Sequence, residues 1–137
     1  MRKKREKPEV DYKEVKAISK AEKYLNLKWR DVFEGVAKLM EENEELNAMQ
    51  ALRELGYSDE IIDYPTSPLG LYIYRKTGKP LIDGFVGDAA KLLNISWDEA
   101  RRLMEWNSDV LNGIQENDLE KSTSGLRSLE SALGSEL

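Results

Sequence analysis

Apolar residues recur at intervals of three and four along the first half of the chain, a spacing that places side chains on one face of an α-helix. The first helix is predicted over residues 12–25, where Asp11 and Glu14 have the D-x-x-E form of a capping box. Its apolar face is expected to comprise Val15, Ile18, Ala21 and Leu25.

A wider apolar stripe between Trp29 and Met40 predicts a second helix that ends near Asn43. Four glutamates within residues 41–45 suit the start of a third helix, because the positive end of the helix dipole favours acidic side chains. The third helix is expected to stop at Gly56, since glycine readily takes the left-handed conformation at that position. Its apolar residues are Leu46, Met49, Leu52 and Leu55.

The middle of the chain has two interpretations. Ser67 and Pro68 place a capping hydroxyl before a residue preset for the first helical position, so a helix that stops at Gly78 is favoured after a short turn capped by Ser58. The competing interpretation is a short hairpin near 71–82, with residues 71–75 paired to residues 79–82. It is less favoured because an isolated two-stranded hairpin is only marginally stable.

Two further helices are predicted beyond residue 86. A short one contains Ala89, Ala90, Leu92 and Leu93 and is closed by Asn94. Ser96 and Glu99 then form an S-x-x-E capping box at the start of the next helix, and Trp97 falls on its apolar face, which predicts burial in the core.

The periodicity weakens after Asn107, and residues 116–125 are polar and flexible in composition. Leu126, Leu129 and Leu133 predict one short terminal helix that ends at Gly134. The fold class expected from these elements is all-α, a compact array of about six short helices with helix-turn-helix-like corners. The expected organisation is a basic arm over residues 1–10, a single helical domain over 11–115 and a polar tail over 116–137.

The residue types present exclude several kinds of chemistry. The 137 residues include no cysteine and no histidine, which removes thiolate nucleophiles, Cys/His zinc sites and imidazole catalysis. No spacing of Asp and Glu suggests a converging carboxylate pair. We therefore expect a non-enzymatic protein with no cofactor. The absence of a signal sequence and of a long apolar run favours a cytoplasmic protein that does not enter a membrane.

Charge is distributed unevenly along the chain. The net charge is −5, but the first seven residues sum to +4 and the remainder to −9. This arm could contact nucleic acid or another anionic partner, or it could be a solvated tail. Its candidate contact residues are Arg2, Lys3, Lys4, Arg5 and Lys7.

The stretch Asn47-Ala48-Met49-Gln50-Ala51-Leu52-Arg53-Glu54-Leu55-Gly56-Tyr57-Ser58 resembles the N-A-T-x-A-A-x-x-A-G-Y-S signature of phage terminase small subunits. The matching positions are Asn47, Ala48, Ala51, Gly56, Tyr57 and Ser58. The resemblance implies a DNA-packaging protein with a DNA-binding helix-turn-helix, an oligomerising helical region and a large ATPase partner. A second corner, over residues 87–106, also has helix-turn-helix spacing, but Trp97-Asp98-Glu99 would bring acidic side chains to the DNA.

Two aromatic residues fall outside the best apolar stripes of their predicted helices. Tyr74 and Trp106 are therefore candidates for a partner-facing patch, since Tyr and Trp are favoured at protein interfaces. The function expected first is a helical protein-binding module, a small phage or mobile-element protein that acts as a component or regulator of a larger assembly. The alternative is a DNA-binding protein that resembles a terminase small subunit and uses the basic arm. The oligomeric state is left open.

Overall fold

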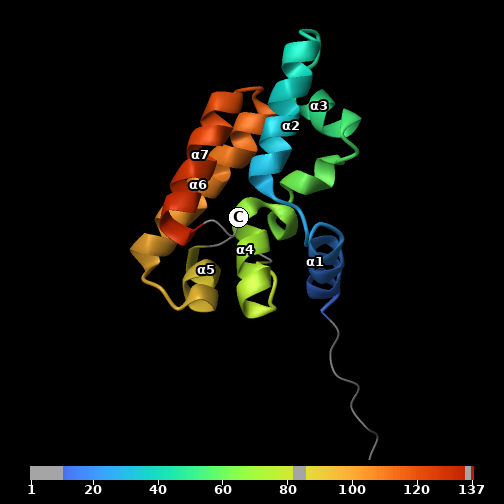
Figure 1. Ribbon diagram of the computed structural model, residues 1–137. Coiled ribbons are helices and arrows are strands. Elements are labelled where there is room, and N and C mark those ends of the chain that lie inside the picture. The colour runs from blue at the N-terminus through green and yellow to red at the C-terminus, as the bar shows by residue number, and fades with distance from the viewer. Residues whose placement is uncertain (1–10, 82–85, 135–136) are drawn as a thin grey trace, which may run out of the picture.

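The chain folds into an array of helices, seen here in a computed structural model that describes residues 11–81, 86–134 and 137 (Figure 1). Within these ranges there are seven α-helices, two 3-10 helices and no β-strand, which confirms the predicted all-α class. The elements are α1 Tyr12–Lys23, α2 Trp29–Glu42, α3 Ala48–Glu54, η1 Asp59–Ile62, η2 Tyr64–Thr66, α4 Pro68–Thr77, α5 Val86–Leu93, α6 Trp97–Gln115 and α7 Leu119–Leu133.

Helix α4 occupies the middle of the array. Figure 1 shows it between α5 and α1, while α6 and α7 lie side by side and α2 runs next to them. Every residue from Pro68 to Ile73 is buried, so the first half of α4 has no solvent-facing side. The hairpin interpretation of residues 71–82 is wrong, because residues 71–75 belong to this buried helix.

The start of α4 is held by two other segments. Ser67 Oγ accepts a hydrogen bond from the Gly70 N–H at 3.1 Å, as the sequence predicted, and the side-chain oxygen of Asn107 in α6 accepts from the Leu69 N–H at 3.0 Å. Gly70 lies so close to the preceding 3-10 helix that a Cβ there would stand 1.8 Å from the Tyr64 carbonyl oxygen. These contacts fix where α4 begins relative to α6 and η2.

Helices α6 and α7 approach each other closely through small residues. Ser122 Oγ donates a hydrogen bond to the Val110 carbonyl at 2.8 Å. Gly113 of α6 and Gly125 of α7 are both buried at this contact. A Cβ on Gly113 would lie 2.1 Å from Ser122 Oγ, and one on Gly125 would lie 2.7 Å from the Trp106 carbonyl oxygen. Larger side chains at these positions would force the two helices apart.

Helix α7 is longer than the terminal helix that the leucine spacing predicted. It begins at Leu119, where Asp118 caps it by accepting a hydrogen bond from a backbone N–H of the first turn. The interpretation of residues 116–125 as flexible is therefore wrong for most of this segment. Its first half is ordered by the burial of Ser122 and Gly125, which no apolar pattern marks.

Helix α1 buries only part of the face that was expected to meet the core, since Ala21 is buried and Ile18 is half-buried. Ala17, Ala21 and the following Tyr24 are buried, whereas Val15 is 53% exposed and Leu25 is 36% exposed. The face that packs on η2 and α4 is thus built from small side chains, which permit a close approach. The prediction that Val15 and Leu25 belong to the core is wrong.

Trp97 also lies outside the core, contrary to the prediction from its helical face. It is the first residue of α6 and is 56% exposed. The buried side of this helix begins only at Ala100 and continues through Leu103 and Met104.

The third helix starts later than the glutamates suggested. Glu41 and Glu42 complete α2, and α3 begins after Asn47. Asn47 and Gln50 form a reciprocal capping box, with hydrogen bonds of 2.8 and 2.9 Å between side chains and backbone N–H groups. This specific cap takes precedence over the weaker preference of acidic residues for a helix N-terminus.

Candidate functional site

A pocket of about 240 Å³ opens where α4, the α5–α6 corner, α6 and α7 meet. Trp106 of α6 lies in its wall and is half-buried, so this candidate residue belongs to a concave site. Most of the remaining wall is apolar, which suits the binding of an apolar group. The large apolar side chains are Tyr72, Leu93, Ile95, Leu103, Trp106 and Leu133.

The α5–α6 corner supplies one wall of the pocket. Asn94 takes the left-handed conformation (φ 53°) and ends α5, and the Ile95 N–H donates to the Ala90 carbonyl at 3.1 Å. Ser96 Oγ then accepts from the Glu99 N–H at 3.1 Å and starts α6, as the sequence predicted. This tight turn places the residues on either side of Asn94 at the pocket wall.

The end of α7 supplies the opposite wall. Because Ser122 and Gly125 hold α7 close against α6, the last turn of α7 comes to lie beside Trp106. Leu133 is half-buried there, and Ala132 lines the pocket while remaining exposed. The pocket therefore depends on the small-residue contact between the two helices.

Three exposed charged side chains stand around the pocket. Lys76 is held by Tyr72, since its ammonium group donates to the phenol oxygen at 3.1 Å and lies 5.5 Å from the ring centroid. Arg102 forms no ion pair with any residue that the structure describes, and neither does Glu99, three residues before it. Among the described lining residues, Lys76 and Arg102 are basic and Glu99 is acidic.

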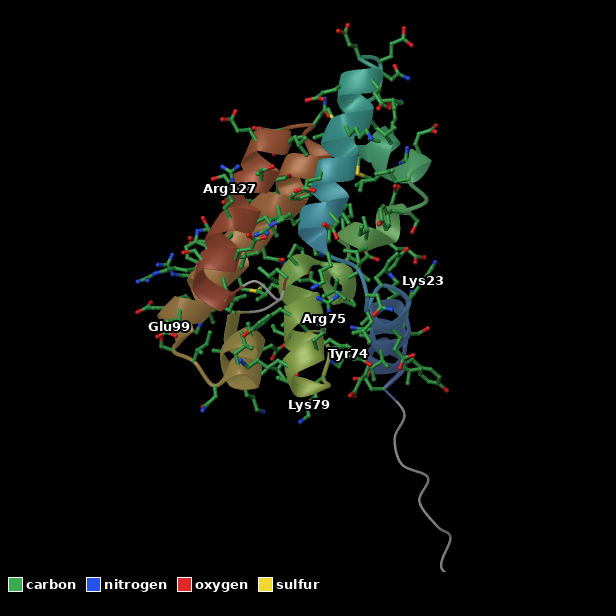
Figure 2. The ribbon with its side chains drawn as sticks, in the orientation of Figure 1. Lys23, Tyr74, Arg75, Lys79, Glu99 and Arg127 are labelled. Atoms are coloured by element: carbon green, nitrogen blue, oxygen red, sulfur yellow. The ribbon has the colours of Figure 1, made fainter. Side chains whose placement is uncertain are left out.

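Tyr74, the second predicted partner-facing aromatic, does not share this surface. It is half-buried and is not part of the pocket wall. In Figure 2 it lies on the side of α4 that faces α1. Its neighbour Arg75 bonds the α1–α2 connection, with donor distances of 2.9 Å to the Leu25 carbonyl and 2.6 Å to the Leu27 carbonyl. Tyr74 and Trp106 therefore do not form one patch.

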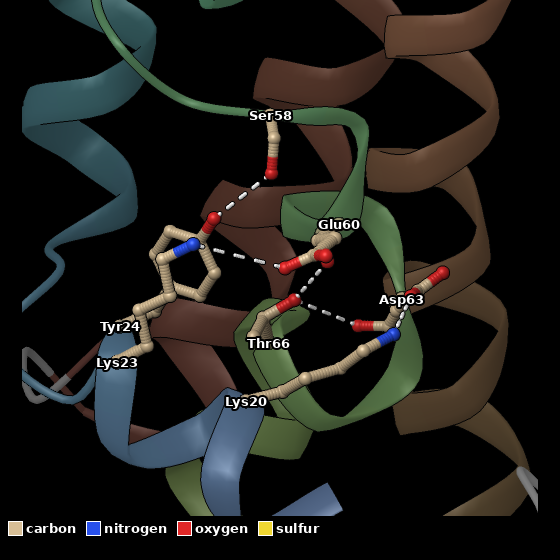
Figure 3. A network of polar contacts seen from close by, with 7 residues as sticks. All are labelled: Lys20, Lys23, Tyr24, Ser58, Glu60, Asp63 and Thr66. Carbon is tan, nitrogen blue, oxygen red and sulfur yellow. Dashed lines mark hydrogen bonds and ion pairs between the residues drawn. The ribbon is translucent and has the colours of Figure 1, made fainter. Parts of the chain in front are cut away.

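The predicted anion-contact residues Arg2, Lys3, Lys4, Arg5 and Lys7 lie outside the described residues. The basic character continues into α1, where Lys13 and Lys16 are exposed. Lys20 and Lys23, further along α1, belong to a polar network that connects α1 to the 3-10 helices (Figure 3).

The polar network in Figure 3 is a structural contact. Lys20 forms an ion pair with Asp63, and Lys23 lies 3.9 Å from a Glu60 carboxylate oxygen. Tyr24 shares a hydrogen bond of 3.0 Å with Ser58. Because the apolar contact of α1 is made largely by alanines, these polar bonds supply much of what orients the helix. These side chains serve as one another's polar partners.

The corner that resembles the terminase signature is followed by a short element. Gly56 has φ 90° and ends α3, as predicted, but Asp59–Ile62 is a single turn of 3-10 helix. Ser58 occupies the cap position of that turn without a side-chain capping bond. Arg53 forms an ion pair with Asp59 at 3.0 Å, and the hydrogen bond from Arg53 holds the pKa of Asp59 below its usual value.

A second groove, of about 420 Å³, runs between α2 and α7. Arg30 and Glu130 form an ion pair across it at 2.5 Å, and the hydrogen bond from Glu130 raises the pKa of Arg30. Phe33 and Leu126 lie in its floor, and the exposed Arg127 stands at its edge. The ion pair already bridges this groove.

Within residues 11–81, 86–134 and 137, no group of three or more Asp or Glu side chains is arranged to hold a metal ion. None of the helices described there is both long and apolar enough to cross a bilayer.

The chain matches no known family model, and comparison with curated proteins and with solved structures gives no significant match. Function must therefore be argued from the site itself. The sequence singled out Trp106 as a candidate because it lies off its apolar stripe. The sequence did not single out Leu93, Ile95 and Leu133, because their spacing is that of ordinary helix-packing residues. They line one pocket only because the fold brings four helices together.

Proposed function

We propose that this chain is a non-enzymatic protein-binding module that holds a partner protein in the pocket around Trp106. The observation that supports this is a half-buried tryptophan in an apolar concavity that remains open to solvent. Tryptophan contributes disproportionately at protein interfaces, because a large rigid ring buries much apolar area at a small cost in entropy. The module would act as a component or regulator of a larger assembly, and the terminase resemblance favours a phage or mobile element as its source.

Position 132 provides a direct test of this function. Ala132 is exposed on α7 and lines the pocket, so Ala132→Phe would fill the pocket without removing a core contact. Ser131→Phe adds the same group at an exposed neighbouring position that does not line the pocket. Both variants should have the far-UV circular dichroism of the unmodified protein.

The assay is affinity capture of the tagged protein from host lysate at low and high salt, with and without nuclease. We expect a partner that resists nuclease and salt, that is retained by Ser131→Phe and that is lost by Ala132→Phe. If Ala132→Phe captures the same partner in the same amount, the pocket is not the interface and the proposal fails.

The alternative function is nucleic-acid binding through the basic arm. The exposed Lys13 and Lys16 of α1 support it, as two further cationic side chains that follow residues 1–7 in the sequence. Recovery of nucleic acid alone, lost at high salt because phosphate contacts release counterions, would favour this function over the first. Deletion of residues 1–7 should then abolish the binding.

A further inference from the structure

We propose that the peptide bond between Asn112 and Gly113 is a site of spontaneous deamidation that the packing of α7 against α6 keeps closed. The inference goes beyond the proposed binding function and concerns residues that do not line the pocket around Trp106. Asn112 is the only asparagine in the sequence that is followed by glycine. It is exposed near the end of α6, and its side-chain amide forms no hydrogen bond with any residue that the structure describes.

The chemistry of an asparagine followed by glycine is intramolecular. The backbone nitrogen of Gly113 loses its proton and attacks the side-chain carbonyl carbon of Asn112, so that a carbon–nitrogen bond forms and the side-chain nitrogen leaves as ammonia. Water then opens the resulting five-membered succinimide at either of its carbonyls, which gives aspartate or isoaspartate at position 112. Glycine favours the attack because it has no Cβ to hinder the nitrogen and because its backbone adopts many conformations. Water is the only co-reactant.

The folded chain holds this peptide bond in a geometry that prevents the attack. Both residues are helical, and a helical N–H points along the axis to the carbonyl four residues earlier. The Asn112 carbonyl accepts a hydrogen bond from the Glu116 N–H at 2.8 Å, and the Gly113 carbonyl accepts one from the Asp118 N–H at 2.7 Å. Turning the Gly113 nitrogen towards the Asn112 side chain would therefore break hydrogen bonds at the end of α6.

Helix α7 adds a second restraint. Gly113 is buried, and a Cβ on it would lie 2.1 Å from Ser122 Oγ, 2.6 Å from the Ser122 nitrogen and 2.7 Å from the Asp118 carbonyl oxygen. The backbone of Gly113 therefore lies directly against the first turn of α7, which runs beside α6 in Figure 1, and has no room to change its conformation. The glycine that permits this close contact also makes Asn112 reactive. Deamidation is expected only in molecules in which α7 has separated from the end of α6.

The products would not fit the closed junction. An aspartate at position 112 adds negative charge to the carboxyl end of α6, which the helix dipole disfavours, and Glu116 four residues later is also acidic. An isoaspartate adds one carbon atom to the backbone, so the hydrogen bonds on either side of it cannot all form in helical register. Deamidation would thus mark chains in which the two helices have separated and would hinder their return.

The first test compares deamidation in the folded and the unfolded chain. The full-length protein is incubated in mildly alkaline buffer with or without concentrated urea, and its peptides are analysed by mass spectrometry for aspartate and isoaspartate at position 112. We expect both products in urea. Without urea the reaction should be at least about 100-fold slower, which corresponds to an opening free energy of about 2.8 kcal/mol.

Two variants distinguish separation of α7 from unfolding of the whole chain. Gly125→Ala places a Cβ 2.7 Å from the Trp106 carbonyl oxygen and pushes α7 away from α6. It should accelerate deamidation of the folded protein by about tenfold, the factor that corresponds to about 1.4 kcal/mol of overpacking. Asn107→Ala is the control, because it removes a hydrogen bond to α4 instead of a contact with α7, and it should leave the rate unchanged.

Hydrogen exchange of the Gly113 amide in the unmodified protein is an independent measurement. Its protection factor should agree within about tenfold with the slowing of deamidation, because the same opening exposes the amide in both reactions. A protection factor further below the slowing would contradict the proposal even if Gly125→Ala failed to fold.

Three other results would overturn the inference. Equal rates with and without urea would show that the fold does not shield the site. Equal acceleration by Gly125→Ala and Asn107→Ala would assign the reaction to the fully unfolded chain. Aspartate without isoaspartate at position 112 would show direct hydrolysis of the side chain instead of attack by the Gly113 nitrogen.

Discussion

The close contact between α6 and α7 can be tested with two glycine-to-alanine substitutions. Gly113 in α6 and Gly35 in α2 are both interior helical positions. In the absence of any contact, alanine would stabilise each helix by about 1 kcal/mol relative to glycine. The surroundings of the two positions decide whether that gain is realised.

At Gly113 the new Cβ would lie 2.1 Å from Ser122 Oγ, 2.6 Å from the Ser122 nitrogen and 2.7 Å from the Asp118 carbonyl oxygen. Two of these atoms are backbone, so α7 itself must move. Overpacking of this kind costs about 1–3 kcal/mol, and the backbone contacts place Gly113→Ala at the upper end. The net loss should be about 2 kcal/mol.

At Gly35 the nearest neighbour would be a terminal methyl of Leu55 at 3.2 Å. Leu55 is 40% exposed, so its side chain can rotate away. Gly35→Ala should therefore stabilise the protein by about 0.5–1 kcal/mol. The two substitutions are chemically identical and are expected to have opposite signs.

The assay is urea unfolding followed by circular dichroism at 222 nm, with the free energy of unfolding taken by linear extrapolation. At about 4 °C per kcal/mol for a domain of this size, Gly113→Ala should also lower Tm by roughly 8 °C. Ser122→Ala in the Gly113→Ala background should restore only part of the loss, because the backbone contacts remain. A Gly113→Ala protein as stable as the unmodified one would refute the packing described for α6 and α7.

Two further predictions follow from polar contacts. Asn107→Ala should reduce the free energy of unfolding by about 2–3 kcal/mol, because it leaves the buried Leu69 N–H without an acceptor. Asn112→Ala, on the exposed side of the same helix, is the control and should have little effect in the same urea assay. Arg53→Gln should raise the pKa of Asp59 towards its usual value, as measured by NMR titration of the carboxyl carbon. Because the folded-state pKa of Asp59 is lowered, any stability from the pair is complete above the usual aspartate pKa and is lost as pH falls through the folded-state value. An unchanged titration in Arg53→Gln would show that the pair does not form.

Local signals in the sequence were sufficient for most helix boundaries. Helix ends depend on hydrogen bonds between residues that are close together in the sequence. The caps at Ser67 and Ser96 and the left-handed Gly56 are therefore visible from a few neighbouring residues. Asn47 was missed as the cap of α3, because the four glutamates before it also suit the start of a helix, although less specifically.

Tertiary contacts were harder to predict, because they depend on which residues are small as well as on which are apolar. Ser122 and Gly125 are the buried positions in the first half of α7, and neither contributes to a hydrophobic pattern. The same holds for Ala17, which is buried in α1 although the predicted apolar face did not include it, whereas Val15 of that face is exposed. For the pocket, Trp106 could be identified as atypical, but its neighbours come from four helices separated in sequence.

The hydrogen bond from Leu69 to Asn107 joins residues 38 positions apart, and this separation sets the order of events during synthesis. At about 5–20 residues per second, α4 leaves the ribosome some 2–8 seconds before Asn107, which accepts the hydrogen bond from its Leu69 N–H. During that interval Leu69, Leu71 and Ile73, which are fully buried in the finished protein, have no α6 to cover them. The nascent chain therefore presents the first half of α4, which is wholly buried in the finished protein, to the cell before α6 can enclose it.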